Sequence, residues 1–89
     1  MKIKLSNYGE MLISHPAGRE AFLSAQAYLL SNLKDDEIIE VDFDGVDVLA
    51  PSWADEFITI LKEKYGDRVK LLKSDNPSVI ATLKFSSPI

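Results

Sequence analysis

A nearly continuous apolar segment near the middle of the chain constrains the fold most. Ile38, Ile39, Val41 and Phe43 are interrupted only by single polar residues. Strands of this composition are typical of sheets with both faces covered, as in parallel sheets packed between other layers. The segment therefore predicts an α/β domain in which helices lie against a sheet.

Weaker patterns on both sides complete the expected element order. Three segments show strand patterns: residues 3–5, 11–13 and 69–72. Three segments show helical spacing of apolar residues: residues 16–33, 52–65 and 77–83. The first two strands are close enough to pair as a hairpin. We expect the order β-β-α-β-α-β-α, a mixed sheet of about four strands and about three helices.

The first helical segment has a broad apolar stripe. Its members are Phe22, Ala25, Leu29 and Leu33, with Ala21 and Tyr28 widening it. Leu23 and Leu30 fall outside the stripe, which suggests a second contact or an exposed patch. They are the first positions to examine for a dimer face, although the sequence leaves the oligomeric state open.

Length and composition limit the classes of function. With 89 residues, the chain is expected to form a single domain over residues 1–89. The absence of Cys excludes disulfides and thiolate metal ligands. The net charge of −4 argues against a nucleic-acid partner, and no apolar run approaches the roughly 20 residues of a membrane span. We expect a cytoplasmic protein that contacts neither nucleic acid nor membrane.

The apolar strand runs into Asp42-Phe43-Asp44-Gly45, which resembles the nucleophile motif of haloacid-dehalogenase-type phosphatases. In that family the first carboxylate attacks phosphorus and the second transfers the proton, so these roles would fall to Asp42 and Asp44. The resemblance stops after four residues, since Val46 and Asp47 replace the hydroxyl and apolar residues expected next. The preferred expectation is that the protein is not an enzyme, with Mg²⁺-dependent phosphoryl transfer as an unfavoured alternative.

A calcium loop is the second interpretation of the same acids. Asp42, Asp44 and Asp47 are closely spaced, but an EF-hand loop needs Gly at its sixth position and Glu at its twelfth. Here Gly45 is at the fourth place and Trp53 at the twelfth. We therefore expect no metal and no other cofactor, with the acids solvated or bonded to nearby N–H groups.

The third interpretation begins at Ser52. The region before it resembles the STAS domain of bacterial anti-sigma factor antagonists. Six residues match that motif in kind: Asp42, Phe43, Gly45, Val46, Val48 and Leu49. The Pro-Ser-Trp-Ala-Asp-Glu-Phe sequence of residues 51–57 is more similar still to a STAS-like family of unknown function, and the resemblance covers residues 11–85.

The resemblance implies a STAS-like fold and a non-enzymatic signalling module that binds a protein. The implied partner is a histidine-kinase-like ATPase or an anti-sigma-type regulator, and Ser52 falls where the partner kinase phosphorylates the antagonists. Ala50, Pro51 and Trp53 depart from the antagonist motif, which weakens a direct transfer of that switch. A small-ligand or nucleotide-binding STAS module is the alternative function.

Ser52 has a structural interpretation as well as a functional one. As a helix N-cap, its hydroxyl would accept a hydrogen bond from the N–H of Ala54 or Asp55. As a phosphorylation site, it would place a phosphate at a helix N-terminus, where Asp55 and Glu56 would oppose the added charge. A plain cap or an unmodified docking residue is favoured over regulated phosphorylation.

The residues around Ser52 define the expected docking surface. Its members are Asp44, Asp47, Ser52, Trp53, Asp55 and Glu56. Trp53 is either an interface anchor or a core residue, and core is somewhat favoured. Arg19 lies in the first turn of its helix, where the dipole disfavours a cation, so an ion pair with Glu56 or Asp55 on the second helix is expected. His15, the single histidine, is expected at the helix entry rather than in catalysis.

Overall fold

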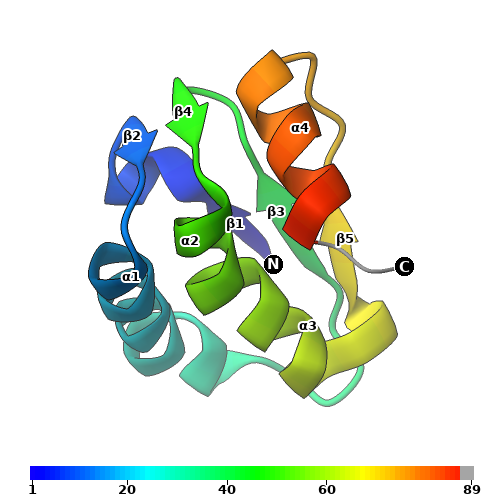
Figure 1. Ribbon diagram of the computed structural model, residues 1–89. Coiled ribbons are helices and arrows are strands. Elements are labelled where there is room, and N and C mark those ends of the chain that lie inside the picture. The colour runs from blue at the N-terminus through cyan, green and yellow to red at the C-terminus, as the bar shows by residue number, and fades with distance from the viewer. Residues whose placement is uncertain (87–89) are drawn as a thin grey trace.

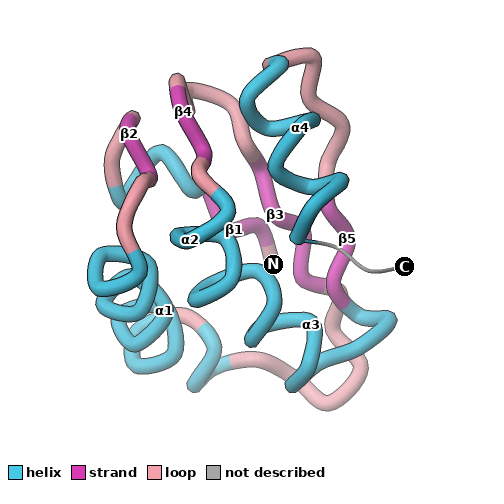
Figure 2. The backbone as a smooth tube through the Cα atoms, viewed as in Figure 1, coloured by secondary structure: helices cyan, strands magenta, loops and turns pink. Residues whose placement is uncertain are grey.

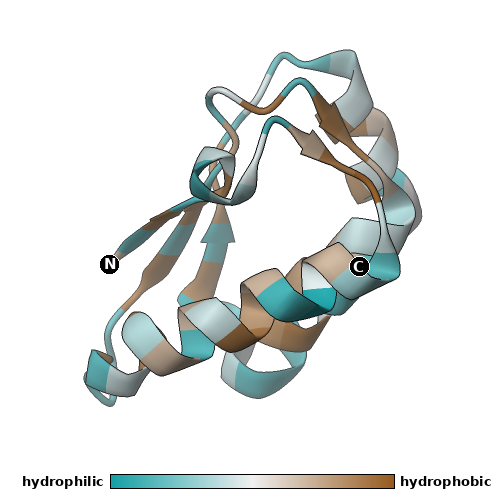
Figure 3. Ribbon diagram, turned by 90° about the vertical axis from the view of Figure 1, so that its left-hand side faces the viewer, coloured by the Kyte–Doolittle hydropathy of each residue, from teal (hydrophilic) through white to brown (hydrophobic). Residues whose placement is uncertain are grey.

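Two small parallel sheets form the framework of the domain. The structure is a computed structural model and describes residues 1–86. β1 (Lys2–Lys4), β3 (Ile39–Asp42) and β5 (Val69–Leu71) form one sheet in the order β1-β3-β5. β2 (Met11–Leu12) pairs in parallel with β4 (Val48–Leu49) in a second sheet. The two sheets stand apart, with the helices around them (Figures 1 and 3).

Helices connect the strands and cover them (Figure 2). They are α1 (His15–Tyr28), α2 (Pro51–Ala54), α3 (Ile60–Tyr65) and α4 (Pro77–Ser86). A π-helical turn, Asp55–Thr59, joins α2 to α3, so that residues 51–65 form one continuous helical segment. Short 3₁₀ turns occur at Leu5–Tyr8, Leu30–Asn32 and Gly66–Arg68. No helix within residues 1–86 is both long enough and apolar enough to span a membrane.

The α/β class is confirmed, but the expected sheet is not. The hairpin between residues 3–5 and 11–13 is wrong, because the 3₁₀ turn after β1 carries the chain away to the second sheet. β1 pairs with β3 instead, and β3 pairs with β5 on its other side, both in parallel. On one face of β3, Ile39 and Val41 are fully buried, but the polar residues of the other face are only half-buried. The expectation of a strand covered on both faces is therefore wrong, because β3 alternates between apolar and polar residues.

A cluster of aromatic side chains fills the core between the helices. Trp53 stacks on Phe57 with ring centroids 5.0 Å apart. Phe22 meets Phe57 edge-on at 5.8 Å, and Tyr8 approaches it at 5.6 Å. Such pairs add about 0.5–1.5 kcal/mol each beyond the area that they bury. Residues from α1, from segment 51–65 and from the turn after β1 are thus held in one core.

The expected apolar stripe of α1 is confirmed in its centre and wrong at its margin. Phe22 and Ala25 are buried on the face of α1 that packs against segment 51–65, but Tyr28 is 78% exposed. Leu30 is buried because α1 ends before it and a 3₁₀ turn directs it inward. Leu23 is 52% exposed, as its position outside the stripe indicates.

Candidate functional site

Ser52 occupies the second position of α2 and is not its N-cap. The helix begins at Pro51, and the N-cap residue, Ala50, makes no side-chain capping bond. The hydroxyl of Ser52 instead donates a hydrogen bond to the carbonyl oxygen of Ile13. The expected cap is therefore wrong, because a proline in the first turn of a helix commonly occupies its first position and moves the cap one residue earlier.

The bond from Ser52 joins two segments that are distant in sequence. Ile13 lies between β2 and α1, and the neighbouring N–H of Ala50 donates to the carbonyl oxygen of Leu12 at 2.8 Å. The Ser52 contact thus continues the pairing of β2 with β4 into the start of α2. Any change that removes the hydroxyl proton breaks a link between two layers of the fold.

The other residues of the expected docking surface differ in exposure. Trp53 is 1% exposed, so its indole packs in the core and is not available as an interface anchor. Asp55 is exposed and Glu56 is half-buried, both on the π-helical turn after α2. The surface near Ser52 is therefore acidic at its edge and does not include the tryptophan.

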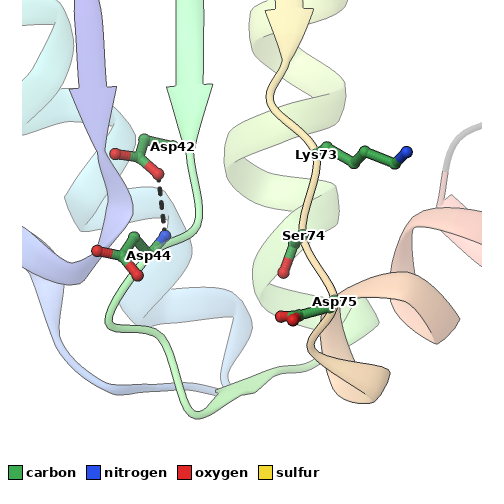
Figure 4. A pocket seen from close by; sticks show the side chains of 5 residues that line it. All are labelled: Asp42, Asp44, Lys73, Ser74 and Asp75. Atoms are coloured by element: carbon green, nitrogen blue, oxygen red, sulfur yellow. Dashed lines mark hydrogen bonds between the residues drawn. The ribbon is translucent and has the colours of Figure 1, made fainter.

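Asp44 lies beside a different feature, a pocket at the carboxyl ends of β3 and β5 (Figure 4). This pocket has a volume of about 390 Å³ and is lined by five residues: Asp42, Asp44, Lys73, Ser74 and Asp75. The carboxylate of Asp42 accepts a hydrogen bond from the N–H of Asp44 at 3.0 Å. Figure 4 shows the Lys73 side chain pointing away from Asp42 and Asp44.

Sequence reasoning missed Lys73, Ser74 and Asp75. They follow β5, while Asp42 ends β3 and Asp44 comes just after it. The carboxyl ends of neighbouring parallel strands meet at one edge of a sheet. With β3 and β5 recognised as parallel neighbours, this signal would have found them.

The charge of the pocket restricts what it accepts. Its lining residues include three carboxylates and only one lysine, so an anionic ligand such as a nucleotide phosphate is disfavoured there. Within residues 1–86, no group of three or more His, Cys, Asp or Glu side chains is placed to hold a metal ion.

The loop that contains Asp47 is tied to α4. The side-chain amide of Asn76 donates to the carbonyl oxygens of Val46 and Asp47, at 2.8 Å and 3.2 Å. Its carbonyl oxygen accepts from the N–H of Ser78 at 2.8 Å, in the first turn of α4. Asp47 is exposed at this junction. The loop therefore belongs structurally with the pocket and α4, and not with Ser52.

A second depression lies between α1 and the helical segment 51–65. Its volume is about 200 Å³, and five residues line it: Arg19, Phe22, Leu23, Glu56 and Ile60. Its floor is apolar, with one cation and one anion among its lining residues. The expected ion pair of Arg19 with Glu56 or Asp55 is not formed within the described part of the chain. The ion pair found within residues 1–86 instead joins the N-terminal ammonium of Met1 to Glu37 at 3.0 Å.

The docking residues expected from the sequence are thus divided between two places. Glu56 lies on the helical depression, in the same helical segment as Ser52 and Asp55. Asp44 lines the pocket at the strand ends. His15 is the exposed first residue of α1, whose N-cap is Ser14. The helical depression, together with Ser52, is the candidate protein-binding site.

Comparison with known proteins assigns the class and then the family. The fold is an α/β arrangement of parallel strands with covering helices, which is consistent with a STAS-like domain. The family model described as "STAS-like domain of unknown function (DUF4325)" matches residues 27–79, more than half of the chain, and the protein belongs to this family. Searches of curated proteins and of solved structures each gave no match. The resemblance expected from the sequence is confirmed.

Proposed function

We propose that this STAS-like domain is a non-enzymatic regulatory module that binds another protein. Its docking face is formed by α1 and by the helical segment 51–65, which contains Ser52. The observation that carries the proposal is the apolar depression between these helices, in which Leu23 is 52% exposed. Membership of a STAS-like family supports a role in regulation or interaction.

The partner that the family resemblance favours is a histidine-kinase-like ATPase or an anti-sigma-type regulator. Phosphorylation of Ser52 by such a partner would remove the proton that Ser52 donates to Ile13. It would also add about −1.5 to −2 charges beside Asp55 and Glu56. The modification would loosen the start of α2. Its added charge would also weaken the binding of a partner that fits the surface beside unmodified Ser52.

Photo-crosslinking tests the docking face directly. A photoreactive residue at position 23, in the depression, is compared with one at Lys70, an exposed position on β5. In the native cell extract, we expect position 23 to crosslink to a protein of the kinase-like ATPase or anti-sigma type, and position 70 to give no such product. Crosslinks to that partner from position 70 alone would place the interface on the sheet and contradict the proposal.

Two further readouts test the finer claims. Mass spectrometry of the peptide containing Ser52 reports whether it is phosphorylated after incubation with the captured partner and ATP. A phosphatase assay with Mg²⁺ tests the non-enzymatic claim, since turnover that disappears in Asp42→Asn would show that the acidic pair is catalytic. We expect no turnover above that of Asp42→Asn.

A further inference from the structure

The residues on the two walls of the helical depression lie at matching heights along the two helices. β2 and β4 are parallel, and each leads into one of the two helices, so α1 and segment 51–65 begin at the same end of the molecule. A Cβ atom on Gly18 would lie 3.1 Å from the Cβ atom of Glu56. Arg19 and Glu56 therefore stand at one level on opposite walls. One helical turn further, Leu23 and Ile60 stand at the next level.

From this arrangement we propose that the depression binds the same face of a second copy of the chain, in a two-fold symmetric homodimer. A two-fold axis parallel to the helices lays α1 of each copy over residues 51–65 of the other. That operation places Arg19 opposite Glu56 of the second copy, and Leu23 opposite Ile60 of the second copy. An interface of this kind is self-complementary because each contact occurs twice.

Charge complementarity selects a second copy as the occupant. Arg19 is the fifth residue of α1, and its charge is not paired with Glu56 in its own chain. A partner with a uniformly basic patch would oppose Arg19, and a uniformly acidic one would oppose Glu56. A second copy, turned about the two-fold axis, offers the opposite charge at both positions.

The size of the face indicates a weak, reversible dimer. Stable interfaces bury about 800 Å² on each partner, roughly one seventh of the 5465 Å² that this chain exposes. Two helical stretches of about 20 Å each, side by side, offer less than that. We therefore expect a dissociation constant on the order of 10 µM to 100 µM.

Self-association would regulate the proposed function, and to that extent the inference rests on it. The dimer covers Leu23 and Glu56, so the second copy and the protein partner compete for one face. At high concentration of the domain, the second copy then covers the docking face until a protein partner displaces it.

Sedimentation velocity of the whole chain, from about 1 µM to about 1 mM, tests the dimer through a charge exchange. The wild type is expected to shift from monomer to dimer across this range. Arg19→Glu and Glu56→Arg should each weaken self-association about tenfold or more, because each places like charges opposite one another. The double variant with both changes should restore it to within about threefold of the wild type.

Two apolar positions on α1 provide the matched control. Leu23→Asp removes an apolar contact at the centre of the face and should abolish the dimer. Tyr28→Asp changes a more exposed residue on the other side of α1, and should leave self-association unchanged. Circular dichroism confirms that each variant is folded, so that loss of the dimer is not loss of the fold.

Other results would overturn the inference. A wild-type monomer at every concentration excludes the dimer, and a dimer that survives Leu23→Asp uses another face. Failure of the double charge exchange to restore association excludes the two-fold pairing. Crosslinking to the protein partner shows whether the dimer or the proposed function has failed. A monomeric chain that still captures its partner contradicts only the dimer, and a dimer that captures none contradicts only the proposed function.

Discussion

Gly18 on α1 faces the carbonyl oxygen of Trp53 so closely that a Cβ atom at position 18 would lie 2.7 Å from it. This contact sets the distance between α1 and segment 51–65 at the end where both helices begin. Because real Cβ atoms do not approach a backbone oxygen this closely, a larger residue here would force the helices apart. The glycine that lowers helix propensity near the start of α1 is thus required by packing.

Gly18→Ala should destabilise the domain by about 1–3 kcal/mol, since the added methyl group overpacks a contact with rigid backbone. In an ordinary helix interior the same change stabilises by about 0.5–1 kcal/mol. The sign of the effect therefore distinguishes the two situations, and urea denaturation measures it. Ser24→Ala, at an exposed position of the same helix, is the control and should change stability by less than about 0.5 kcal/mol. A stabilised Gly18→Ala would show that the helices are not in close contact.

The sequence predicted those parts of the fold that long periodic patterns determine. The core face of α1 around Phe22 and Ala25 follows from spacing alone, and so does the burial of Ile39 and Val41 on one face of β3. The pairing of the strands does not. β2 and β4 contain two residues each, which is too short for alternation to be recognised. Their partners are set by the path of the chain through the core.

The candidate site was predictable only in part, for two different reasons. The role of Ser52 depends on where α2 begins. The sequence predicted that this helix begins at residue 52, whereas Pro51 is its first residue in the structure. The depression beside Leu23 depends on how closely two helices approach. That distance is set by Gly18 and Trp53, which lie far apart in sequence, so no local pattern contains it.

Ser52→Asp should destabilise the domain more than Ser52→Ala does. Alanine loses one hydrogen bond, worth about 1 kcal/mol. Aspartate also loses it, because a carboxylate cannot donate a proton at neutral pH, and places a negative charge against the carbonyl oxygen of Ile13. We expect an additional cost of about 1 kcal/mol or more for aspartate. Thermal unfolding of the two variants gives the comparison.

Ser14 supplies the control for Ser52. It is the N-cap of α1, and its hydroxyl accepts a hydrogen bond from the N–H of Ala17 at 3.2 Å. Asp is as good an N-cap as Ser, so Ser14→Asp should be nearly neutral. If Ser52→Asp were equally neutral, Ser52 would be acting as a cap, and its hydrogen bond to Ile13 would not contribute to stability.

Asn76 should not tolerate replacement by aspartate, although both residues are good N-caps. The exchange keeps the oxygen that accepts from Ser78 but removes the amide that donates to Val46 and Asp47. It also directs a carboxylate at two carbonyl oxygens. We expect Asn76→Asp to cost about 1–3 kcal/mol, measured by urea denaturation. Asn32→Asp makes the same chemical change at an exposed position and should cost less than about 0.5 kcal/mol. Equal effects would mean that only the added charge matters.

Glu37 should give the domain an acid-dependent contribution to stability. Its carboxylate accepts a hydrogen bond from the N–H of Lys34 at 3.2 Å and lies 3.0 Å from the Met1 ammonium. The Lys34 bond, followed by the one from the N-terminus, holds the pKa of Glu37 below its ordinary value of 4.5. A carboxyl group with a lowered pKa in the folded state stabilises that state above its ordinary pKa. This stabilisation is lost as the pH falls through the lowered value, since the proton then binds in the folded state as well.

Glu37→Gln tests this contribution, because glutamine resembles the protonated acid at every pH. The melting temperature of the wild type should exceed that of Glu37→Gln near neutral pH, and the two should converge as the pH falls below 4.5 toward and through the lowered pKa of Glu37. Glu63→Gln makes the same change of charge at an exposed position of α3, and its difference from the wild type should vary much less over this range. A constant difference between wild type and Glu37→Gln would show that the carboxylate contributes through its shape and not through its charge.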